Sequence, residues 1–95
     1  MITFSECESI FSDTNVFEVT DKGGGIKYTR VDMKVLSPNN EHYSFGYRRM
    51  PNGFNDVAEV FFGKWEPMRS YVVCHNICDK DFLLTLIEEC KNCKF

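Results

Sequence analysis

The sequence predicts an α+β fold, an antiparallel sheet of three to four strands with an N-terminal and a C-terminal helix packed on it. Apolar residues recur at helical spacing near both ends of the chain, alternate with polar residues in the middle, and are interrupted by turn-forming residues. With 95 residues, of which 43% are hydrophobic, the chain can bury a core without disulfides. We therefore expect a single α+β domain over residues 1–95.

Two segments are predicted to be helical. Residues 3–12 begin with Thr3 and Glu6, the spacing of a capping box. Residues 80–92 follow Asp79, a preferred N-cap residue. The expected buried stripe of the first helix is Phe4, Cys7, Ile10 and Phe11. That of the second helix is Leu83, Leu86, Ile87 and Cys90.

The strand candidates lie between these helices. Residues 16–19 and 70–74 are short and rich in valine, and residues 26–36 and 41–49 are predicted to pair as a hairpin. In the first strand of that hairpin the apolar phase changes, which indicates a bulge near Thr29 and Arg30. Residues 55–63 favour a short helix slightly over a strand, with Phe61 in the core.

The N-terminal residues carry acidic side chains where a signal peptide would need positive charge and an apolar run. No apolar stretch approaches the ~20 residues of a membrane span. We therefore expect a cytoplasmic protein with no membrane contact.

The net charge of −3 is unevenly distributed. The first 21 residues have no Lys or Arg, and their acidic residues are Glu6, Glu8, Asp13, Glu18 and Asp21. Residues 22–50 carry an excess of basic residues, including Arg48 and Arg49. The acidic segment could imitate nucleic-acid phosphates toward a basic groove, or the basic hairpin could face an acidic patch. The overall charge disfavours direct nucleic-acid binding.

A second candidate surface is aromatic. Trp, Phe, Met and Arg are enriched at protein interfaces, and several of them cluster in the second half of the chain. Phe62 and Trp65 are harder to bury together with Phe61 if the segment is helical, so we expect one of them to reach a surface. Phe62, Trp65 and Arg69, together with the acidic and basic residues above, form the predicted partner-binding set. A second copy of the chain is also allowed as a partner, which would give a homodimer.

The cysteines allow one metal hypothesis. Cys74, Cys78, Cys90 and Cys93 have a spacing close to that of paired zinc ligands. A continuous helix over 80–92 would separate Cys78 from Cys90 by about 18 Å of rise, too far for one zinc ion. We therefore predict no metal and no cofactor, and keep a zinc- or nucleic-acid-binding domain organised by these cysteines as the alternative.

No catalytic pattern is present. Cys74 and His75 are adjacent on a predicted strand, so their side chains point to opposite faces and cannot form a nucleophile and base. The glycines at 23–25 lack the remainder of a phosphate-loop motif. The sequence thus predicts a non-enzymatic protein that binds and inhibits or adapts a larger protein or protein–nucleic-acid complex.

Two resemblances concern layout. The helix followed by three strands resembles double-stranded RNA-binding domains, but residues 52–56 lack the lysine cluster with which that family grips phosphates. In size and layout, though in no motif, the chain is similar to the small phage inhibitors of host defence, of the anti-CRISPR or anti-restriction type. That resemblance implies an inhibitor that acts in the host cytoplasm.

Overall fold

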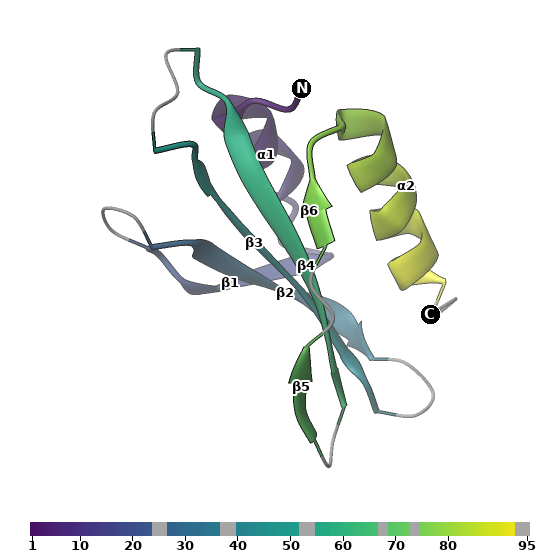
Figure 1. Ribbon diagram of the computed structural model, residues 1–95. Helices are drawn as coiled ribbons and strands as arrows, with labels where there is room; N and C mark the ends of the chain where they lie inside the picture. Colours follow the sequence, from purple (N-terminus) through teal and green to yellow (C-terminus); the bar gives the residue numbers. More distant parts are fainter. Residues whose placement is uncertain (24–26, 37–39, 52–54, 67–68, 73–74, 93–95) are drawn as a thin grey trace.

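The computed structural model describes residues 1–23, 27–36, 40–51, 55–66, 69–72 and 75–92, with residues 36, 66, 69–72 and 75 described in their backbone only. Along the chain the elements are α1 (Phe4–Ile10), β1 (Phe17–Asp21), β2 (Thr29–Leu36), β3 (His42–Arg49), β4 (Ala58–Glu66), β5 (Arg69–Val72), β6 (His75–Ile77) and α2 (Lys80–Lys91) (Figure 1). The predicted α+β layout with a helix near each end is confirmed. The sheet is larger than the three to four strands expected, because β1 to β5 form a five-strand antiparallel path and β6 also pairs with β4.

Strand β4 pairs with three other strands, with β3 on one edge and with β5 and β6 on the other. One of its edges pairs with β3 over the full length of that strand, from Arg49↔Ala58 to His42↔Trp65. Its other edge pairs with β5 at Trp65↔Val72 and with β6 at Phe62↔His75, and these two pairs keep the same register. Near the start of β4, Ala58 donates its backbone N–H to the carbonyl oxygen of Ile2 at 3.0 Å. The segment 55–63, expected to be helical, therefore belongs largely to the most extensively paired strand.

Alternation along the strands gives the sheet two different faces. The buried residues of both helices and of one sheet face form a single core cluster. From the sheet, the cluster includes Phe17, Val31, Met33, Tyr43, Phe45, Tyr47, Ala58, Val60, Phe62 and Ile77. From the helices it includes Cys7 of α1, the C-cap residue Phe11 that follows it, and the whole predicted stripe of α2. In Figure 1 both helices lie around the half of the sheet that carries β6, and β5 lies at the far end of β4.

One expectation about strand phase is wrong, and the irregularity expected near Arg30 lies in the partner strand β1. Phe62 is the core residue at 2% exposure, and Phe61, expected in the core, is half-buried on the opposite face. The pairing of β2 with β3 is regular at Thr29↔Tyr47 and Arg30↔Gly46, so no bulge interrupts this ladder there. The β2–β3 register shifts between Asp32 and Leu36. On the other edge of β2, the β1–β2 register shifts between Val19 and Asp21, opposite Val31 and Arg30, so the extra residue lies in β1. The apolar phase changes because Tyr28 precedes β2 on the face opposite Val31.

The start of α1 is held by two sets of polar contacts. The predicted capping box is present, with Thr3 and Glu6 each accepting a hydrogen bond from the other's backbone N–H. Asp56 adds a contact from the β3–β4 connection. Its carboxylate accepts from the Ser5 hydroxyl at 2.7 Å and from Arg49 Nε at 3.0 Å. Because these bonds favour the ionised form, the pKa of Asp56 lies below its ordinary value.

We expect Asp56→Asn to lower the free energy of unfolding at neutral pH, measured by urea denaturation. Asn tolerates the positive φ of 53° at this position, so the lost charge is the main change. A lowered pKa in the folded state stabilises at pH values above the ordinary pKa of the carboxyl, and that contribution disappears as the pH falls through the folded value. The difference between the two proteins should therefore shrink in acid.

The exposed helix residue Glu89 offers a matched control, because Glu89→Gln also removes one carboxylate. It should leave stability nearly unchanged. An Asp56→Asn protein as stable as the wild type at pH 7 would contradict the role assigned to this carboxylate.

Candidate functional site: an apolar groove on the open face

The sheet face opposite the helices, called the open face here, carries a groove of about 400 Å³. Its floor and walls follow from the strand register. Gly46 of β3 stands between Arg30 and Phe61, and in the next row Ser44 stands opposite Gly63. Glycine at adjacent positions of the two central strands leaves the backbone uncovered. The larger side chains around these glycines therefore become walls.

Tyr28 and Phe61 form one wall by meeting above Gly46. Their strands are not neighbours, and two strand spacings are about 9.5 Å. The rings nevertheless make an edge-to-face contact with centroids 4.8 Å apart. Gly46 lies in the strand between them and places no side chain beneath this contact. A Cβ built on Gly46 would lie 3.4 Å from Cβ of Tyr28, an ordinary contact distance.

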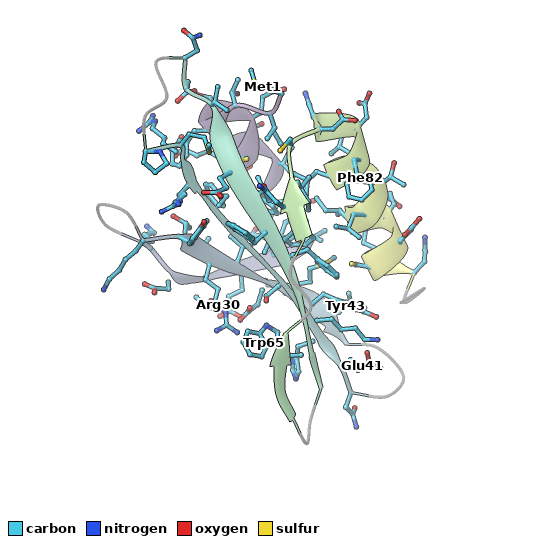
Figure 2. All side chains as sticks on the ribbon, in the orientation of Figure 1. Met1, Arg30, Glu41, Tyr43, Trp65 and Phe82 are labelled. Atoms are coloured by element: carbon cyan, nitrogen blue, oxygen red, sulfur yellow. The ribbon has the colours of Figure 1, made fainter. Side chains whose placement is uncertain are left out.

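Trp65 forms another wall and is held in place by a hydrogen bond. Its indole Nε1 donates to the Ser44 hydroxyl at 2.7 Å. These two residues are diagonal neighbours across the β3–β4 pair, and Gly63 directly opposite Ser44 leaves room for the indole to reach across. Arg30 lies over the indole ring at 5.1 Å from the centroid, and Figure 2 shows the two labelled side chains close together. Trp65 is thus oriented before any ligand arrives.

The charges around the groove are paired. Arg30 forms an ion pair with Asp32 at 3.2 Å, and Arg48 forms one with Glu59 at 2.9 Å. The Tyr28 hydroxyl also donates to Glu59 at 3.0 Å, and Arg48 lies over the Tyr28 ring. Burial raises the pKa of Tyr28, and the bond to Glu59 adds to this, so the phenol remains a donor. The groove is therefore apolar inside and nearly neutral at its rim.

The predicted aromatic site residues separate into two groups. Both Trp65 and Phe62 border the groove, but the side chain of Phe62 is only 2% exposed and belongs to the core on the other face. Arg69 lies in β5 opposite Glu66, and its side chain is outside the described part. The strongest wall residues that sequence reasoning missed are Tyr28 and Phe61. Each is an aromatic residue out of phase with the core residues of its strand, which is the pattern that could have identified them.

The acidic residues of the first 21 positions are not brought together on one surface. Glu6 caps α1 and forms an ion pair with Lys80 at 3.1 Å. Glu8 is exposed on α1, which packs on the core face. Glu18 pairs with Asp32 in the β1–β2 ladder and shares the open face. Asp13 is exposed and accepts a hydrogen bond from the Asn15 backbone, and Asp21 is exposed at the end of β1.

The arginines of the predicted basic hairpin face opposite sides of it. Arg48 lies over Tyr28 on the open face. Arg49 lies over the Phe4 ring at 4.3 Å and pairs with Asp56 at 3.0 Å. Each guanidinium has a carboxylate neighbour, which reduces the field expected of a basic patch.

The cysteines differ sharply in accessibility. Cys7 and Cys90 are buried, Cys78 is exposed, and none of these three is in a disulfide. Cys74 and Cys93 lie outside the described residues. Helix α2 is continuous from Lys80 to Lys91, so about 15 Å of helical rise separates Lys80, two residues after Cys78, from Cys90, too far for Cys78 and Cys90 to share one metal ion. Among the residues that the structure describes, no three His, Cys, Asp or Glu side chains are grouped to hold a metal.

In the described part of the chain, neither helix has the length and apolar character needed to cross a membrane. Comparison with known protein families, with curated proteins and with solved structures found no match.

Ser44→Ala should release the indole of Trp65, the single tryptophan of the chain. We expect lower fluorescence anisotropy and a loss of about 1 kcal/mol in unfolding free energy, the usual contribution of one hydrogen bond. Ser12→Ala removes another serine hydroxyl bond, at the end of α1, and should leave the fluorescence unchanged. If Ser44→Ala leaves the anisotropy at the wild-type value, the hydrogen bond does not orient Trp65.

The thiols should react with iodoacetamide at very different rates in the folded protein. Burial raises the pKa of Cys7 to about 12, so at pH 8 it is almost entirely protonated and also inaccessible. Peptide mapping by mass spectrometry should show rapid labelling of Cys78. Cys7 and Cys90 should be labelled only after denaturation, and fast labelling of Cys7 in native conditions would contradict its buried position.

Proposed function

We propose that this protein is a non-enzymatic binding module whose open-face groove receives an apolar side chain of a larger protein partner. Binding there would inhibit or adapt the partner. The observation that carries the proposal is the apolar groove itself, which has a glycine floor and aromatic walls already oriented by Ser44 and Glu59. Oriented aromatic walls lower the ordering cost of binding. A groove open along the sheet suits one anchor side chain of an interface better than a fully enclosed small molecule.

Nucleic acid is the second candidate partner. The observation that favours it is the set of aromatic rings on an open sheet face, an arrangement on which bases can stack. Nucleic-acid binding also needs cations that neutralise phosphates. Here the two arginines next to the groove, Arg30 and Arg48, are already paired with carboxylates. Tight binding of single-stranded oligonucleotides that is lost in Trp65→Ala would reverse this order.

The size and layout of the chain extend the proposal to a phage-type inhibitor of a bacterial defence protein. The mode of inhibition would then be capture of an apolar anchor. Acidic mimicry has less support, because Glu6 is engaged by Thr3 and Lys80 and the other acidic residues are spread over both faces. The dependence of affinity on salt concentration distinguishes capture of an apolar anchor from acidic mimicry. Groove binding should keep most of its affinity at high ionic strength, whereas an acidic mimic should lose it steeply.

A larger side chain in the groove floor provides the direct test. Gly46→Ala places a methyl group beneath the Tyr28–Phe61 contact at ordinary contact distance, and alanine is better than glycine in a strand by roughly 0.5–1 kcal/mol. We expect unchanged or higher stability. Peptides selected from a displayed random library on the wild-type protein should share one aromatic or aliphatic anchor. They should bind Gly46→Ala at least about tenfold more weakly.

The control is Thr20→Ala in β1, which changes an exposed residue outside the groove. The same three proteins are then compared as baits in cell extract, with bound proteins quantified by mass spectrometry. A genuine partner should bind the wild type and Thr20→Ala but not Gly46→Ala. Selected peptides and captured proteins that bind all three equally would overturn the proposal.

A further inference from the structure

A second hollow, called the basic pocket here, lies on the other side of the β2–β3 hairpin from the groove. It has a volume of about 240 Å³ and lies between the first residue of α1 and the paired ends of β2 and β3. Its charged groups are those of Lys27 and Arg49, because Arg48, which also borders the pocket, directs its guanidinium to the open face, and its hydroxyl groups come from Thr29 and Tyr47. The pocket therefore gathers several hydrogen-bond donors of different geometry in a small volume.

The two cationic side chains of this pocket, Arg49 and Lys27, differ in their contacts. Arg49 stacks on Phe4 at 4.3 Å, and only its Nε is used in the hydrogen bond to Asp56. Lys27 has no ion pair among the described residues. Its backbone is constrained by Gly23, where any Cβ would collide with the carbonyl oxygen of Lys27. Glycine at position 23 thus permits the close approach that brings the lysine to the pocket.

The acidic groups near the pocket leave an excess of positive charge. Asp56 and Glu59 are each bound to one of the arginines, so the charge of Lys27 is not offset by either. Glu8 lies near enough to Tyr47 to act on its phenol. Burial is the largest influence and raises the pKa of Tyr47, while a hydrogen bond from the Thr29 side chain lowers it. The Tyr47 hydroxyl therefore stays protonated and, with its oxygen accepting from Thr29, can donate to a ligand.

We propose that the basic pocket binds a phosphate group. An arginine fork, a lysine ammonium and hydroxyl donors approach from different sides, which matches an oxyanion with several acceptor oxygens better than a single carboxylate. The site is independent of the groove and of the partner proposed for it. It stands on the core face of the hairpin, whereas the groove stands on the open face.

The test is a titration of the full chain with inorganic phosphate, followed by amide chemical shifts at constant ionic strength. We expect saturable shifts at Lys27, Thr29 and Arg49, and at least several-fold weaker binding by Lys27→Gln. Lys22→Gln removes a nearby lysine that does not line this pocket and should bind like the wild type. Glu8→Gln should bind more tightly, because it removes a nearby negative charge.

Phenyl phosphate is titrated in parallel. Tighter binding of the ester assigns the site to a phosphate carried by a larger molecule, and equal binding assigns it to the free ion. The proposal is overturned if chloride produces the same shifts at the same concentrations, or if Lys27→Gln binds phosphate as well as the wild type. Because Lys27 is exposed, its substitution should not unfold the protein, and the spectrum itself verifies this.

Discussion

The alternation of side chains along β4 is the constraint on which both faces of this protein depend. Its even positions, among them Val60 and Phe62, enter the core beneath the helices, and its odd positions, Phe61, Gly63 and Trp65, build the groove. Because the side-chain period of a strand is two, a register slip of one residue would exchange the two sets. Pairing along both edges of β4 prevents such a slip, so the contacts that stabilise the core also position the groove.

The groove exists because glycine occupies positions in two central strands, where it is normally unfavourable. Gly46 places no side chain beneath the contact of Tyr28 with Phe61, and Gly63 lets Trp65 reach Ser44. Side chains at both glycine positions would improve strand propensity but would occupy the space between the walls. Substituting these two glycines with larger residues would thus fill the groove. That the open face instead holds oriented aromatic rings above bare backbone is an argument for a binding role.

Local patterns predicted the parts of the fold that local interactions determine. The capping box at Thr3 and the buried stripe of α2 need only residues within a few positions of one another, and the structure confirms both. The strand faces could not be predicted in the same way. Phe61 and Phe62 are adjacent and equally apolar, and only pairing with β3 and β6 decides which of them faces the helices. The groove was missed for the same reason, because its walls come from three strands and its floor from residues without side chains.

The order of charged residues along the sequence also fails to predict where charge lies on the folded surface, and this affects how a partner would be recognised. In the sequence, an acidic segment precedes a basic one, which predicts opposite electrostatic surfaces. In space, Glu6 pairs with Lys80, and Arg48 and Arg49 pair with carboxylates contributed by the β3–β4 region. Ion pairing of this kind weakens the field that Glu6, Arg48 and Arg49 would otherwise contribute. The binding proposed for the open face would therefore depend mainly on shape and apolar contact, and the exposed Lys27 beside the hairpin is one place where charge retains an influence.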